Sequence, residues 1–141
     1  MDIVVVNQCW GGCSGALSVL LGNGDGTFKP AVAYPTGPNP FSLAVGDFKG
    51  DGKLDLAVTS DCNPTCGGFA SIYLGNGDGT FQAKVDYTVG SSPSELIAVD
   101  LNNDGKLDIA VTVTASTAGV VSSYDAVVIL LGKAMGHFSQ R

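Results

Sequence analysis

Residues 100–108 read DLNNDGKLD, which places three aspartates and two asparagines within nine positions. Carboxylates held this close repel one another and raise one another's pKa unless a cation lies between them. Calcium takes six to eight oxygen ligands at roughly 2.3–2.6 Å, and a glycine at the sixth position lets a loop curl so that alternate residues turn inward. The spacing therefore predicts a metal site, and a set of hydrated Asx turns is the simpler alternative.

The segment 47–55, DFKGDGKLD, repeats this pattern 53 residues earlier. Its third position is Lys49, and because an ammonium group has no lone pair for a metal, we expect weaker calcium binding there. In both loops the seventh position is expected to ligate through its backbone carbonyl. The predicted ligands are Asp47, Asp51, the carbonyl oxygen of Lys53, Asp55, Asp100, Asn102, Asp104, the carbonyl oxygen of Lys106 and Asp108.

The loops belong to a longer internal repeat, since LGNGDGTF at 21–28 returns at 74–81 with the same offset. Each repeat contains short runs rich in valine, isoleucine, leucine and tyrosine, separated by Asn-Gly and Asp-Gly turns, which is typical of β-hairpins. Segments rich in proline, serine and glycine at 35–40 and 90–93 predict linkers. The sequence therefore predicts an all-β fold made of β-propeller blades, each of four antiparallel strands.

The repeat boundaries predict one partial propeller over residues 1–141, with about two and a half to three blades. The expected units are a partial blade at 1–34, a complete blade at 41–88 and a partial blade at 94–141 that lacks its outer strand. Closed propellers need at least about four blades. The missing blades are expected from a longer chain or from self-assembly of copies.

Two segments carry a family resemblance: DFKGDGKLDLAV at 47–58 and DLNNDGKLDIAV at 100–111. Together with the GNGDGTF turns, they resemble the FG-GAP or VCBS-type repeat of integrin alpha-chain propellers and secreted bacterial proteins, over nearly the whole chain. The resemblance implies calcium in the loop between the first and second strands of a blade. It also implies a secreted or cell-surface protein that acts in adhesion or recognition of a protein or carbohydrate ligand.

Composition narrows the classes of function. A net charge of −6 argues against a nucleic-acid partner. The sequence contains no apolar run of about 18 residues, so membrane insertion is not expected. The first ten residues lack the basic region and cleavage site of a signal peptide. With one histidine and one glutamate, the chain offers no catalytic constellation, so we expect no enzyme. The alternatives are an accessory propeller of a larger secreted enzyme and a purely structural repeat.

Four cysteines form two pairs with the same spacing, Cys9 with Cys13 and Cys62 with Cys66. Local disulfides in an oxidising compartment are the favoured interpretation, and one zinc ion held by all four is the alternative. Trp10 lies within the first pair and could stack on a sugar or pack on a neighbouring loop. We expect His137 at the surface.

Asp25 and Asp78 occupy the GNGDGTF segments. Each could ligate a metal, but the segment is too short to wrap around an ion. A hairpin turn with glycines at positive φ is therefore the favoured interpretation.

Overall fold

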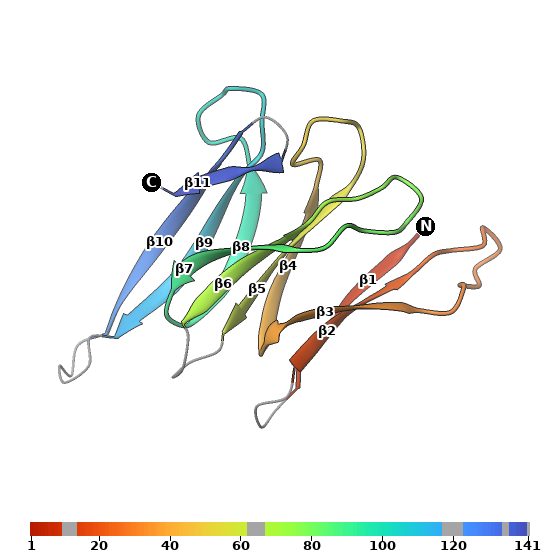
Figure 1. Ribbon diagram of the computed structural model, residues 1–141, viewed down its shortest axis with the longest axis horizontal. Coiled ribbons are helices and arrows are strands. Elements are labelled where there is room, and N and C mark those ends of the chain that lie inside the picture. Colours follow the sequence, from red (N-terminus) through yellow and green to blue (C-terminus); the bar gives the residue numbers. More distant parts are fainter. Residues whose placement is uncertain (10–13, 62–66, 117–122, 134–135, 141) are drawn as a thin grey trace.

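The computed structural model describes all residues except 10–13, 62–66, 117–122, 134–135 and 141. The described residues form β-strands and turns with no α-helix, and the strands pair into three antiparallel sheets that lie side by side along the molecule (Figure 1). This confirms the predicted all-β class and the arrangement in repeated, blade-like units.

The sheets follow one another in sequence. The first sheet contains β1 (Ile3–Asn7), β2 (Ser14–Leu20) and β3 (Val32–Pro38). The second sheet contains β4 (Pro40–Gly46), β5 (Asp55–Asp61), β6 (Gly68–Tyr73) and β7 (Val85–Gly90). The third sheet contains β8 (Pro93–Val99), β9 (Asp108–Ser116), β10 (Ser123–Gly132) and β11 (Phe138–Gln140). In each sheet, neighbouring strands along the chain are also neighbours in space.

The predicted linkers are shorter than expected. Only Asn39 separates β3 from β4, and only two residues separate β7 from β8. Asn39 and Ser92 have φ angles of 44° and 45°, so a single left-handed residue reverses the chain at each junction. Of the prolines that suggested a long linker, Pro38 and Pro40 lie at strand ends, Pro40 opposite Ser60 beside a bulge, and Pro35 lies within β3 opposite Ala16.

The third sheet contains an outer strand, which corrects the expectation that this unit lacks one. The strand β11 is only three residues long and pairs Phe138 with Gly132. Its short length and single aromatic residue gave no alternating pattern in the sequence. Phe138 is nevertheless 7% exposed, and its burial in the core explains why so short a segment is ordered.

Two hydrophobic clusters fill the spaces between the sheets. The first cluster joins the first and second sheets and contains Leu17, Val19, Leu56, Val58 and Tyr73. The second joins the second and third sheets and contains Phe48, Ala57, Ala70, Ile72, Val89, Leu96, Ile109, Val111, Val113, Leu130 and Phe138. Because β5 contributes to both clusters, side chains on both of its faces are buried.

Buried hydroxyl groups link neighbouring sheets. Thr59 is fully buried; its Oγ1 donates to the carbonyl oxygen of Ser94 at 2.9 Å and accepts the backbone N–H of Ser42 at 3.0 Å. Tyr73 donates its hydroxyl to the carbonyl oxygen of Pro35 at 3.0 Å, and burial raises the pKa of that phenol. Each group is satisfied across a sheet boundary, so these bonds fix how adjacent sheets align.

Candidate metal loops

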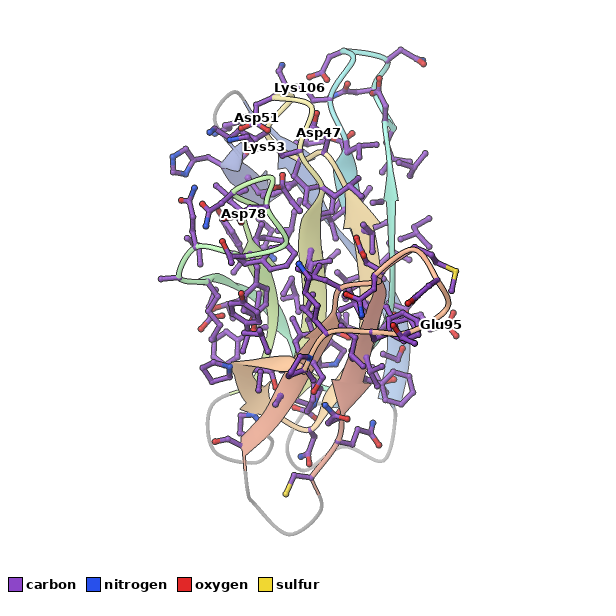
Figure 2. All side chains as sticks on the ribbon, turned by 90° about the vertical axis from the view of Figure 1, so that its right-hand side faces the viewer. Asp47, Asp51, Lys53, Asp78, Glu95 and Lys106 are labelled. Atoms are coloured by element: carbon purple, nitrogen blue, oxygen red, sulfur yellow. The ribbon has the colours of Figure 1, made fainter. Side chains whose placement is uncertain are left out.

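The two aspartate-rich loops occupy equivalent places in the fold. Residues 47–54 join β4 to β5, and residues 100–107 join β8 to β9, so each loop follows the first strand of a four-stranded sheet. Figure 2 shows Asp47, Asp51, Lys53 and Lys106 toward the same end of the molecule, while Glu95 lies away from them. The topology therefore places the two aspartate-rich loops at the same end of the sheets.

The first aspartate of each loop organises the turn. Asp47 accepts the backbone N–H groups of Gly50 and Asp51 on Oδ1, at 2.7 and 3.1 Å, and that of Gly52 on Oδ2 at 2.7 Å. Burial raises the pKa of the Asp47 carboxyl, but these three donors outweigh it and hold the pKa below its ordinary value.

Asp100 has the same role in the second loop. It accepts the amides of Asp104 and Gly105 at 3.2 and 2.8 Å. Each carboxylate oxygen has two lone pairs, and a hydrogen bond from one amide N–H uses one of them. Asp47 and Asp100 therefore keep lone pairs for a further ligand.

The middle positions differ between the loops. In the second loop, Asn102 accepts the amide of Asp104 at 2.9 Å, and Asp104 accepts the amide of Lys106 at 2.9 Å. In the first loop the ammonium of Lys49 lies 3.0 Å from Asp51 Oδ2. Lys49 departs from the ligand pattern in the structure as well as in the sequence, because its ammonium lies against the carboxylate of Asp51.

The lysine side chains and backbone amides around the middle aspartates also lower the pKa values of those aspartates. The hydrogen bond from Lys49 is the main cause that lowers the pKa of Asp51, and the amide of Lys106 is the main cause that lowers the pKa of Asp104. Both carboxylates are therefore stabilised in the charged form, which is the form that could bind a cation.

The last aspartates of the loops are buried and contact the neighbouring hairpin. Asp55 and Asp108 are 1% and 0% exposed. Asp55 Oδ1 accepts the amide of Gly75 at 2.7 Å, and Asp108 Oδ1 accepts the amide of Gly132 at 2.7 Å. Asp2 repeats the arrangement in the first sheet, since its Oδ1 accepts the amide of Gly22, just after the end of β2, at 2.9 Å.

This hydrogen-bonding role of the last aspartate was missed by sequence reasoning, although the repeat carries a signal for it. Asp2 precedes Gly22, and Asp55 precedes Gly75, by the same 20 residues. At each of the three glycines a Cβ would lie 2.1–2.3 Å from the carbonyl oxygen of the residue before the paired aspartate. Glycine is therefore required by close backbone approach. The assignment of Asp55 and Asp108 as metal ligands stays a prediction.

The GNGDGTF segments form tight turns, as the sequence predicted. Asp25 Oδ1 accepts both the amide and the hydroxyl of Thr27, at 2.9 and 2.6 Å, and Asp78 makes the same two bonds to Thr80. The threonine hydroxyls are the main cause that lowers the pKa of both aspartates. The glycines at 24, 26, 77 and 79 all have positive φ. These aspartates are thus used within their own turns.

Few of the other singled-out residues can be placed. Cys13, Cys62, Cys66 and Trp10 lie outside the described residues, so the disulfide, zinc and stacking predictions are not tested. His137 is exposed, as expected, and its carbonyl oxygen accepts the amide of Lys133 at 2.8 Å.

A search of the described part of the chain finds no group of three or more carboxylate, imidazole or thiol side chains placed to hold a metal ion by themselves. In the second loop the remaining oxygen donors would be Asn102, backbone carbonyls and water, all of which calcium accepts. The donor set around Asp100, Asn102 and Asp104 therefore fits a hard cation. A lysine lies against the central aspartate in both loops, Lys49 at 3.0 Å from Asp51 and Lys106 at 3.4 Å from Asp104. The first loop fits a cation less well, because Lys49 stands where the second loop has the oxygen donor of Asn102.

The chain forms three similar antiparallel sheets, and in each sheet an aspartate accepts a hydrogen bond from the glycine of a neighbouring turn. This repetition defines a repeat protein of the β-propeller type. A model of the FG-GAP-like repeat matches residues 1–58 and 59–111, and the chain belongs to this family. No curated protein and no solved structure matches the chain. Within the described residues, no helix is both long and apolar enough to span a membrane.

Proposed function

We propose that this chain is a calcium-binding segment of a secreted or cell-surface propeller that acts in recognition or adhesion of a protein or carbohydrate ligand, without catalysis of its own. The observation that carries the proposal is the 100–108 loop, where Asp100, Asn102 and Asp104 curl into nested turns and hydrogen bonds hold the pKa of Asp104 below its ordinary value. Family membership supports the same role, and the predicted local disulfides between the cysteine pairs would accord with an oxidising location.

The 100–108 loop would hold the ion through Asp100, Asn102, Asp104 and the carbonyl oxygen of Lys106. When bound, calcium would neutralise the carboxylates and so stabilise the folded state. The chain's own residues prepare the loop: backbone amides orient Asp100 and Asp104, and Asp108 anchors the loop to the adjacent hairpin at Gly132.

The proposal predicts that calcium raises the melting temperature. At a free calcium concentration of 100 times Kd, the expected gain in the free energy of unfolding is about 2.7 kcal/mol. Differential scanning calorimetry in excess calcium and in excess chelator measures it, with magnesium as the control. Asp104→Ala should remove most of the gain. Identical melting in calcium and chelator would reject the proposal.

A second prediction compares the two loops. Lys49 places an ammonium where the other loop has Asn102, so we expect isothermal titration calorimetry to show one calcium per chain at concentrations too low to fill the weaker first loop. Lys49→Asn should raise the stoichiometry to two, because it removes the competing cation and adds an oxygen ligand. The matched variant Asn102→Lys should abolish binding. Two ions bound by the unmodified chain would show that Lys49 does not block the first loop.

A further inference from the structure

Two of the tight turns contain an asparagine that is followed directly by a glycine. Asn23 precedes Gly24 in the first GNGDGTF segment, and Asn76 precedes Gly77 in the second. These residues are all exposed. The side-chain carbon Cγ of an asparagine can bond to the next backbone nitrogen, because the bond closes a five-membered ring. Glycine leaves this approach unobstructed, since it has no Cβ.

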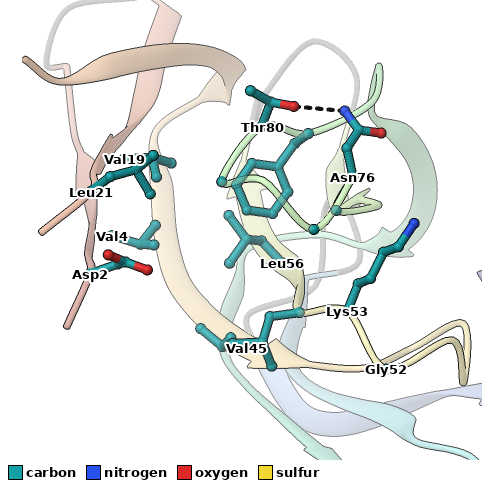
Figure 3. Close-up of a pocket in the computed structure, with 15 residues that line it drawn as sticks. Asp2, Val4, Val19, Leu21, Val45, Gly52, Lys53, Leu56, Asn76 and Thr80 are labelled. Carbon is teal, nitrogen blue, oxygen red and sulfur yellow. Dashed lines mark hydrogen bonds between the residues drawn. The ribbon is translucent and has the colours of Figure 1, made fainter. Parts of the chain in front are cut away.

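The turns hold each asparagine side chain by its nitrogen alone. Asn76 Nδ2 donates to Thr80 Oγ1 at 2.8 Å, and the hydroxyl of Thr80 donates to Asp78 Oδ1 at 2.6 Å (Figure 3). Asn23 Nδ2 donates to Thr27 in the same way, at 2.8 Å. No donor in the described part of the chain bonds the Oδ1 of either asparagine. The carbonyl group of each side-chain amide is therefore exposed to a nucleophile.

The backbone amides that follow these asparagines differ from those in the metal loops. The metal loops contain the comparable steps Asp51-Gly52 and Asp104-Gly105, but there the amide of Gly52 donates at 2.7 Å, and that of Gly105 at 2.8 Å, to the first aspartate of the loop. In the two turns, nothing among the described residues accepts the amide of the glycine after the asparagine. These amides can lose a proton to solvent without first breaking a hydrogen bond.

The aspartate of the same turn is a poorer target for such an attack. Hydrogen bonds from Thr80 lower the pKa of Asp78, so its carboxylate stays ionised. A negative carboxylate repels a deprotonated amide, whereas the side-chain amide of Asn76 is neutral. The asparagines are therefore the reactive positions of these turns.

We propose that Asn23 and Asn76 are sites of spontaneous deamidation. The backbone nitrogen of the following glycine gives its proton to hydroxide and bonds to Cγ of the asparagine. The Cγ–Nδ2 bond then breaks, and the nitrogen takes a proton from water and leaves as ammonia. Water opens the resulting succinimide ring to aspartate or isoaspartate, so each site gains a negative charge. The third sheet has Lys133 at this position and cannot react in this way.

The product does not fit the hydrogen bonds of the turn. Asn76 donates to Thr80, whose hydroxyl proton already goes to Asp78. A carboxylate at position 76 has no proton to donate and repels the like charge of Asp78. Isoaspartate also adds a backbone carbon directly after Gly75, whose amide donates to the buried Asp55 at 2.7 Å. Deamidation at position 76 therefore destabilises the hairpin that this bond holds to β5.

The test incubates the full, folded chain in mildly alkaline buffer with chelator, so that calcium has no influence. Peptide mapping by mass spectrometry, with separation of aspartate from isoaspartate, follows each position. We expect conversion at Asn23 and Asn76 at least about tenfold faster than at Asn102 and Asn103. These two asparagines are matched controls, because they are exposed in a loop but precede no glycine.

A second arm tests the role of the glycine amides. Asp51 and Asp104 should form isoaspartate more slowly in the folded chain than in urea, since unfolding frees the amides of Gly52 and Gly105. A third arm tests the consequence for stability. The variant Asn76→Asp carries the charge of the product and should melt at a lower temperature than the unmodified chain.

Three outcomes would overturn the proposal. Both turn asparagines could stay intact in the folded chain while they convert in urea, which would show that the turns prevent ring closure. All four asparagines could convert at the same rate, which would show that the glycine step has no special reactivity. Unchanged melting of Asn76→Asp would show that the turn tolerates the product.

Discussion

Asp108 shows at the scale of one residue why the two ends of an aspartate-rich loop must be distinguished. It is fully buried, and its carboxylate accepts the amides of Gly132 and Leu101. Asp104, in the same loop, is exposed, and its carboxylate accepts hydrogen bonds only from Asn102 and Lys106 in the turn. The carboxylate of Asp108 is therefore needed for folding, and the carboxylate of Asp104 is available for a ligand.

We predict that Asp108→Ala lowers the free energy of unfolding by about 2–5 kcal/mol, because it leaves the buried amide of Gly132 and the partly buried amide of Leu101 without an acceptor. Asp104→Ala should cost less than about 1 kcal/mol in chelator. Urea unfolding in the presence of chelator measures both, since calcium then contributes to neither. If the two substitutions cost the same under these conditions, the buried hydrogen bonds do not have the role assigned to them.

At the scale of the elements, the glycine that opens each hairpin turn is as constrained as the aspartate it contacts. A Cβ on Gly75 would lie 2.2 Å from the carbonyl oxygen of Leu54, a backbone atom that cannot move without disturbing the sheet. In contrast, a Cβ on Gly24 would contact no other atom within 4 Å, although its φ is +90°. One glycine is thus required by crowding and the other only by its backbone angle.

We predict that Gly75→Ala lowers the free energy of unfolding by about 2–3 kcal/mol, since the alanine must displace β5 or break the bond to Asp55. Gly24→Ala should cost about 1 kcal/mol, the price of a left-handed alanine. Chemical denaturation of both variants provides the comparison. A larger loss for Gly24→Ala would mean that the turn angle, rather than the close approach, limits the stability of the hairpin.

The sequence was sufficient for elements whose signal is local. Alternating apolar residues located the strands, and the Asp-Gly steps located the tight loops at 47–55 and 100–108. It was insufficient where the cause is a distant contact. The strand β11 is ordered through Phe138, which packs on Phe48 some 90 residues earlier. The bond from Gly132 to Asp108 likewise depends on which hairpin lies behind the loop, and one sequence position does not show this.

At the scale of the whole molecule, the two interfaces between sheets are built from the same repeat but have different completeness. The second and third sheets share a cluster that includes Phe48, whereas the first and second sheets enclose a cavity beside the open edge of β1. Local stability follows from this difference, because amides that lack a strand partner and lie under loosely packed side chains open at low free energy.

We predict that the β1 amides that point away from β2 exchange with deuterium at least about tenfold faster than those of β5, which lies between two strands. The strand β9 is the control, since it too is paired on both sides and should match β5. Exchange measured by NMR, at a concentration where light scattering shows a monomer, provides the comparison. Equal protection of β1 and β5 in a monomer would mean that the β1 edge is covered within the chain, and that its exposure does not set the local stability of the first sheet.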